Sequence, residues 1–188
     1  MIKLEIYNRP GKDLSEKELE KLHEEILSVA GECLDEIPRY QCLTGERKEY
    51  SRVIISLARN KEGKLLGFCS SYILEVGSRN VLHLGLTCVS PQARSLGLTH
   101  KLSSKVVKYY LLNYSLFKPA WISNVACVLS SLGNVPFISK TFILLHLKEN
   151  LRRNKKRSPV ISVRTTALNC ISIKVQGSVI SVLSLKRV

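Results

Sequence analysis

Residues 87–102 read Thr-Cys-Val-Ser-Pro-Gln-Ala-Arg-Ser-Leu-Gly-Leu-Thr-His-Lys-Leu, and this stretch decides our prediction of the fold. A run typical of a β-strand stops at Pro91, a short turn follows, and a helix begins around Gly97. The first N–H groups of a helix have no partner within it, so together with the helix dipole they can hold a phosphate. Arg94 adds a mobile positive charge beside them. The stretch therefore predicts a phosphate-binding turn between a strand and a helix.

The same stretch resembles the coenzyme A-binding motif of the GNAT acyltransferases, which is Gln/Arg-x-x-Gly-x-Gly/Ala after a strand of the form Val-x-Pro. Val89, Pro91, Arg94 and Gly97 stand at the positions of that motif. Thr99 departs from it, because the family has a small residue there that lets the pyrophosphate approach the backbone. The resemblance implies an N-acetyltransferase that uses acetyl-CoA (coenzyme A) as acyl donor and needs no metal.

Hydrophobic periodicity predicts the element order β-α-β-β-β-α-β, which is the order of the GNAT fold. Hairpin connections make the three middle strands antiparallel, whereas the later helical crossover joins parallel neighbours. We therefore expect an α/β (α+β) fold of the GNAT type, with a mixed, mostly antiparallel central sheet flanked by helices in three αβα layers. The expected strands are residues 3–7, 52–59, 65–76, 81–89 and 120–125, and the expected helices are 15–31, opened by a Ser15–Glu18 capping box, and 96–113.

The resemblance covers residues 81–125 by motif and about 1–147 by element order, and we expect a single domain over residues 1–188. Residues 148–188 are expected to be its atypical part. The signals there are a further helix at 137–151, a basic run at 152–157, and β-like segments at 160–163, 170–175 and 179–185. We interpret the basic run as a solvated helix end; the alternatives are contact with the 3′-phosphate of coenzyme A, an acidic partner or nucleic acid.

The composition favours a cytoplasmic protein with no membrane segment. A chain of 188 residues can bury its own core without disulfides or metal. Its apolar runs are shorter than the roughly 20 residues that span a bilayer, and its N-terminus lacks the apolar segment of a signal peptide. The six cysteines form no Cys-x-x-Cys pair, so we interpret them as reduced and buried.

The net charge of +14 is unevenly distributed. Residues 1–50 hold 12 acidic and 8 basic residues, a net charge of −4, whereas residues 51–188 hold 3 acidic and 21 basic residues, a net charge of +18. A basic body favours an anionic partner. Coenzyme A, nucleic acid and acidic proteins all satisfy that requirement, and charge does not choose among them.

The resemblance also implies how the chain would hold acetyl-CoA. The strand before the turn binds the pantetheine arm through its backbone, and an N–H near Cys88 polarises the carbonyl of the thioester. Asn124, on the next strand, bonds a pantetheine amide or caps a helix. The expected cofactor-binding residues are Thr87, Cys88, Val89, Arg94, Ser95, Leu96, Gly97, Leu98, Thr99 and Asn124.

His83 is the candidate catalytic base. Strict alternation along a strand places His83, Gly85, Thr87 and Val89 on one face, and His83 lies six residues before Val89, where several GNAT members have a catalytic Glu. A histidine with a pKa near ~6.5 can accept the proton of an amine directly or through water. The alternative is a half-buried histidine hydrogen-bonded within the sheet, since many GNAT enzymes rely on water.

The acceptor is expected to be a primary amine on a small molecule or peptide, attacked directly in a ternary complex. Acidic residues of the loop 33–50 would suit a cationic acceptor, and Tyr72 either lines the acceptor side or belongs to the core. Ser130 and Ser131 lie where many family members have a Tyr that protonates the thiolate. Two alternative functions stay open: a degenerate acyl-CoA-binding protein without turnover, and a basic nucleic-acid-binding module, which is not favoured because aromatic interleaving is absent.

Overall fold

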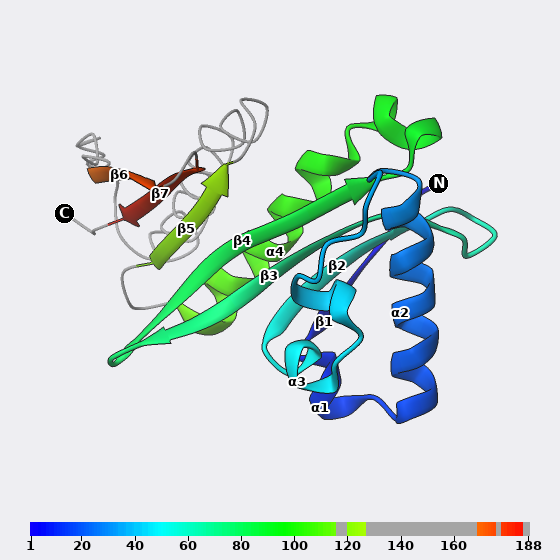
Figure 1. Cartoon of the computed structure of the whole chain (residues 1–188), viewed down its shortest axis with the longest axis horizontal. Helices are drawn as coiled ribbons and strands as arrows, with labels where there is room; N and C mark the ends of the chain where they lie inside the picture. Colours follow the sequence, from blue (N-terminus) through cyan, green and yellow to red (C-terminus); the bar gives the residue numbers. More distant parts are fainter. Residues whose placement is uncertain (116–119, 127–168, 176–177, 186–188) are drawn as a thin grey trace, which may run out of the picture.

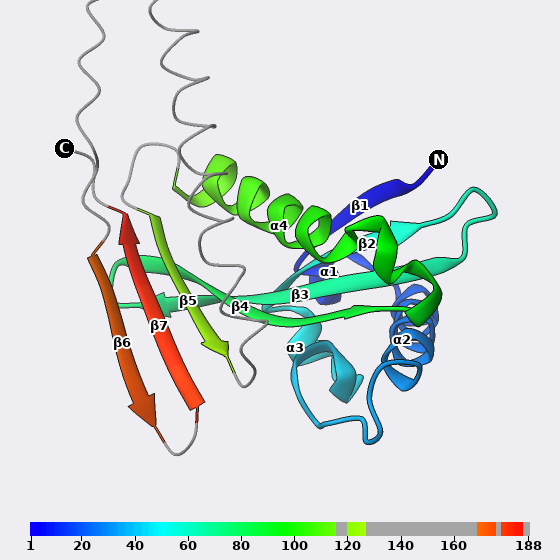
Figure 2. The same ribbon diagram turned by 90° about the horizontal axis from the view of Figure 1, so that it is seen from above.

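The computed structural model describes residues 1–115, 120–126, 169–175 and 178–185 of the chain, and these residues form one seven-stranded sheet with helices on both faces (Figure 1, Figure 2). The strands are β1 (Lys3–Asn8), β2 (Val53–Arg59), β3 (Leu65–Val76), β4 (Arg79–Val89), β5 (Ala120–Ala126), β6 (Asn169–Val175) and β7 (Ser178–Leu185). The α-helices are α1 (Pro10–Asp13), α2 (Glu16–Gly31), α3 (Arg47–Tyr50) and α4 (Leu98–Tyr114), and the 3₁₀ helices are η1 (Gln41–Thr44) and η2 (Pro91–Leu96).

The strand order is β1-β2-β3-β4-β5-β7-β6. Neighbouring strands are antiparallel except β4 and β5, which are parallel because α4 carries the chain back across the sheet. The expected mixed, mostly antiparallel sheet is confirmed. The β-like segments 170–175 and 179–185 form the hairpin β6–β7, which extends the sheet beside β5, whereas the expected elements at 137–151, 152–157 and 160–163 lie outside the described residues.

Two apolar layers cover the sheet, one on each face. Figure 2 shows α2 and α4 on opposite sides of it. Helix α2 begins at the predicted Ser15–Glu18 capping box and buries five apolar side chains, Leu19, Leu22, Ile26, Val29 and Ala30. Helix α4 covers the opposite face with Leu98, Leu102, Val106 and Tyr110 fully buried. Each such side chain contributes roughly 1.5–3 kcal/mol by leaving water, so the two helices fix the sheet between them.

The loop between α2 and β2 is more structured than its polarity indicated, since it contains η1 and α3. The structure also contains α1, where the sequence predicted only the end of a strand. Arg9, which precedes α1, has a left-handed backbone with φ 51°. Gly11 packs so closely on α3 that an added Cβ would meet the carbonyl oxygen of Arg47. The contact of α1 with α3 is therefore tertiary, which explains why local patterns missed it.

Strand β4 contains a bulge that reverses the direction of its side chains. Ser71 of β3 is in register with Leu84 and Cys69 with Thr87, which leaves Gly85 and Leu86 together opposite Ser70. Leu82 and Leu84 belong to the layer under α4, but Leu86 and Cys88 belong to the layer under α2, and Val89 returns to the α4 layer.

The prediction that His83, Gly85, Thr87 and Val89 share one face is therefore wrong. His83 and Gly85 face the α2 layer, together with Cys88, whereas Thr87 and Val89 face the α4 layer. The physical reason is the one extra residue in β4, because a single insertion moves every later side chain to the other face.

Candidate functional site

Strand β4 leaves its parallel partner part of the way along its length. It pairs with β5 only from Val81 to Leu84, where the last register is Leu84 with Asn124, and then continues alone on that side to Val89. The divergence begins at the bulge, which increases the local twist, and Figure 2 shows β5 turning away from β4. Among the described residues, the β5-facing backbone edge of residues 85–89 has no strand partner. An extended ligand with amide groups can pair with such an edge.

This edge leads directly into the turn predicted to bind phosphate. Helix η2 covers Pro91–Leu96, and Gly97 follows with φ 63°, a left-handed conformation that favours glycine. An added Cβ at Gly97 would meet nothing within 4 Å, so the space over the turn is open. Arg94, Ser95 and Leu96 are exposed beside it.

Helix α4 begins immediately after Gly97, which places its first N–H groups at this open turn. Leu98 is fully buried, so it offers only its backbone to a ligand while its side chain anchors the helix, and Thr99 is partly exposed. Lys101, which the sequence analysis did not select, donates from Nζ to the carbonyl oxygen of Leu96 at 3.0 Å. The turn therefore combines backbone donors with two cationic side chains.

Cys88 and Val89 are also limited to backbone roles. The side chain of Cys88 is buried, and burial, with the adjacent thiol of Cys33, raises the pKa of the Cys88 thiol to about 12. Cys33 donates from Sγ to the carbonyl oxygen of Val89 at 3.2 Å, which attaches the end of α2 to β4. Cys88 is therefore poorly suited to act as a nucleophile, and the backbone function expected for it stays a prediction.

His83 lies at the point where β4 and β5 separate. It is in register with Ser123 of β5, and its Nδ1 lies 2.9 Å from Ser123 Oγ. Its Nε2 lies 3.4 Å from the hydroxyl of Tyr40, which comes from the loop before η1. Partial burial lowers the pKa of His83 below its usual value of 6.5, so the imidazole is neutral at neutral pH.

A chain of hydrogen bonds continues from His83 into the protein. Gln41 Nε2 donates to the hydroxyl of Tyr40 at 3.1 Å, and the hydroxyl of Ser70 donates to Gln41 Oε1. Because Tyr40 accepts from Gln41, its own O–H is directed to His83 Nε2, and we assign the proton of the neutral ring to Nδ1, facing Ser123. Tyr40, Gln41 and Ser123 were missed at the sequence level, and no local pattern marks them.

Tyr72 forms the wall next to His83, with which it is in register on β3. Its hydroxyl donates to Glu49, and the guanidinium of Arg52 lies 5.6 Å from its ring centroid. Its ring meets that of Tyr40 edge-on, with the two centroids 6.4 Å apart. Burial and the carboxylate of Glu49 raise the pKa of Tyr72, so it stays protonated. Glu49 comes from the loop expected on the acceptor side, and it brings a carboxylate to this wall.

The described residues thus bring His83 to one end of the unpaired β4 edge and Gly97 to the other. Asn124 stands in the last register of β5 with β4. Thr87 differs from the expectation of a common face, because its side chain lies on the α4 side. In the part of the chain that the structure describes, no helix is long and apolar enough to cross a membrane.

Comparisons with known proteins identify the fold. No family model and no curated protein matches the sequence. A solved structure of a putative GNAT-family acetyltransferase from Desulfovibrio desulfuricans aligns over 99% of both chains, with a TM-score of 0.50 and 11% identity. A GNAT-family acetyltransferase from Staphylococcus aureus Mu50 aligns over 99% of this chain and 100% of its own, with a TM-score of 0.49 and 16% identity. The chain has the GNAT acetyltransferase fold, as the motif at residues 81–125 implied.

Proposed function

We propose that the protein is an N-acyltransferase that transfers an acetyl group from acetyl-CoA to a primary amine by direct attack in a ternary complex. The observation that carries this proposal is the course of β4. The strand leaves β5 after Leu84, has no strand partner on that side through residues 85–89 among the described residues, and is followed through η2 by the turn at Gly97. Such an edge followed by such a turn suits a ligand with an amide-bearing arm and a pyrophosphate.

The residues fit that ligand in two places. The backbone of residues 85–88 offers hydrogen bonds to the amides of the pantetheine arm, and one of its N–H groups can polarise the thioester carbonyl. The first turn of α4, with Arg94 and Lys101, offers N–H groups and positive charge to the pyrophosphate. When bound, acetyl-CoA supplies the activated acyl group, and the chain supplies the hydrogen bonds, the positive charge and the base.

His83 supplies the base in this proposal. Its imidazole is neutral at neutral pH, and Nε2 receives the proton that the amine loses as the nitrogen bonds to the acyl carbon. For that step Tyr40 turns its O–H away, which its exposed position on the loop before η1 permits. Ser123 holds the other ring nitrogen, so the ring keeps its orientation. As the C–S bond breaks, a proton passes to the sulfur, and the exposed hydroxyl of Tyr40, which contacts His83, can relay it.

The first experiment is a thermal-shift measurement with acetyl-CoA. A ligand at 100 times its Kd stabilises the folded state by about 2.7 kcal/mol, which raises the midpoint of a chain of this size by roughly 5–10 °C. Gly97→Glu places bulk and negative charge over the turn and is expected to remove the shift. Gly77→Glu is the matched control, because Gly77 has a similar φ of 59° and open space, at the β3–β4 hairpin.

A second experiment separates the enzyme from a degenerate binding protein, for which the departure at Thr99 is the specific reason. Release of free thiol is measured across a panel of primary amines, both small molecules and peptides. Turnover with any amine supports the enzyme. Binding of acetyl-CoA without thiol release supports the degenerate alternative, and an unchanged calorimetric titration of the Gly97→Glu variant contradicts both.

A further inference from the structure

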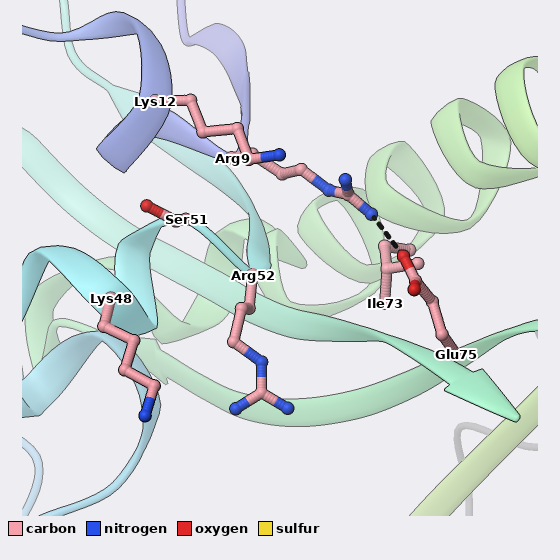
Figure 3. A pocket seen from close by; sticks show the side chains of 7 residues that line it. All are labelled: Arg9, Lys12, Lys48, Ser51, Arg52, Ile73 and Glu75. Carbon is pink, nitrogen blue, oxygen red and sulfur yellow. Dashed lines mark ion pairs between the residues drawn. The ribbon is translucent and has the colours of Figure 1, made fainter.

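A second pocket lies far from the Gly97 turn, at the other end of β3 (Figure 3). Gly67 of β3 pairs with Val89, just before the turn, whereas the pocket is lined by Ile73 and Glu75. Along an extended strand, Gly67 and Glu75 are about 25 Å apart. The pocket has a volume of about 400 Å³, within the usual range for small-molecule sites. Most of its lining residues belong to α1 and α3 or lie directly beside them.

Positive charge dominates this pocket. Four of its lining side chains are cationic and one is anionic: Arg9, Lys12, Lys48 and Arg52 against Glu75. Arg9 pairs with Glu75 at 3.6 Å, and Arg52 lies 3.9 Å from Glu49. The ammonium groups of Lys12 and Lys48 form no ion pair or hydrogen bond with another described residue. Two positive charges are therefore left uncompensated at one concave surface.

Arg9 is held there at a cost to the folded chain. Its backbone is left-handed, with φ 51° and ψ 51°, which disfavours a side chain that carries a Cβ. Its Nε is buried and has no hydrogen-bond partner among the described residues. A buried charged donor without an acceptor destabilises a protein. The terminal guanidinium nitrogens of Arg9, one of which reaches Glu75, are the part that an anion in the pocket would meet.

We propose that this pocket binds a small multivalent anion, of which a phosphate-bearing molecule is the best match. Guanidinium groups on Arg9 and Arg52 present planar donors that suit phosphate oxygens, and Lys12 and Lys48 add point charges. Figure 3 shows Arg9 and Lys12 coming from the segment at α1, and Lys48 and Arg52 from the segment at α3. A nucleic-acid strand fits less well, because the described lining of the pocket has no aromatic side chain on which a base could stack, and Arg52 already covers the ring of Tyr72. The site is independent of acetyl-CoA binding.

The test uses pyrophosphate as the probe and isothermal titration calorimetry at near-physiological salt. Lys12→Ala/Lys48→Ala removes the two uncompensated charges and is expected to weaken binding at this pocket about tenfold or more. Lys17→Ala/Lys21→Ala is the matched control, since these lysines are exposed on α2 and the change in net charge is the same. Its affinity is expected to stay within about twofold of the unmodified protein. Pyrophosphate bound at the Gly97 turn contributes equally to all three titrations.

Glu75→Gln is expected to change the affinity for pyrophosphate in the opposite direction. It removes the one anionic side chain that lines the pocket and releases Arg9, so binding of pyrophosphate is expected to tighten several-fold. Identical titrations for the unmodified protein and the Lys12→Ala/Lys48→Ala variant would overturn the proposal, as would an equal loss in both double variants. Weaker binding in Glu75→Gln, with its folding confirmed by circular dichroism, would also overturn it.

Discussion

Replacing Gly85 with Ala is expected to destabilise the protein through one side chain, that of Gln41. A methyl group at position 85 would overlap the amide of Gln41, which is buried and bonded to both Tyr40 and Ser70. The backbone of Gly85 itself is not left-handed, so Ala is acceptable there as far as the main chain is concerned. The amide must therefore move, and both of its hydrogen bonds are lost.

The magnitude follows from those two bonds. Each buried polar group left without a partner costs about 1–3 kcal/mol, and a Gly to Ala change returns about 0.4–1 kcal/mol through the unfolded chain. We expect a net loss of about 1–5 kcal/mol in the free energy of unfolding, measured by urea denaturation monitored by circular dichroism. In a Gln41→Ala background the obstruction is gone, so Gly85→Ala is expected to cost little or nothing there.

Gly67→Ala serves as the control. An added Cβ at Gly67 would meet the carbonyl oxygen of Cys88 at 2.9 Å, a backbone contact that the Gln41→Ala change does not relieve. Its cost is therefore expected to be the same in both backgrounds. An equal cost of Gly85→Ala in the two backgrounds would refute the assignment of the Gln41 amide as the obstruction, and with it the reason for a glycine at the bulge.

Three further predictions concern the site and α4. His83→Gln is expected to lower thiol release about 10²-fold or more while the Kd for acetyl-CoA stays within about twofold; near-normal turnover would exclude His83 as the base. Because burial lowers the pKa of His83, the unfolded chain binds its proton more readily than the folded chain. Stability is therefore expected to fall as the pH drops below about 6.5 towards the folded pKa, and less steeply in His83→Gln; parallel pH profiles of unfolding free energy would argue against this. Tyr110→Phe removes a 2.6 Å hydrogen bond to the carbonyl oxygen of Asn80 and is expected to cost about 0.5–1.5 kcal/mol, whereas Tyr109→Phe, which removes no such bond, should be close to neutral in the same urea titration.

Much of the fold was encoded locally. The capping box of Ser15 and Glu18 fixed the start of α2, Gly77 marked where β3 ends, and Gly97 marked where α4 begins. The helical crossover between β4 and β5 required parallel pairing, which the structure confirms. These features depend on residues close together in the sequence or on chain connectivity, so the sequence alone was sufficient to predict them, along with the GNAT fold.

The site depended on tertiary structure to a greater degree. The bulge at Gly85 and Leu86 arises from pairing with β3 and from the buried amide of Gln41, so strict alternation placed Thr87 on the wrong face. Tyr40 precedes His83 in the sequence and Ser123 follows it, each at a long distance along the chain. Both contact His83 only because the tertiary structure brings these segments together.

The same reason applies to the cationic pocket. Residues 1–50 are acidic overall, yet Arg9, Lys12 and Lys48 from that segment gather with Arg52 around one cavity. The sequence determined the strand–turn–helix at residues 87–102 and the class of fold to which it belongs. Only the tertiary structure decided which side chains surround β4, the strand before that turn, and where positive charge accumulates. Contacts between distant residues form only when the strands and helices pack.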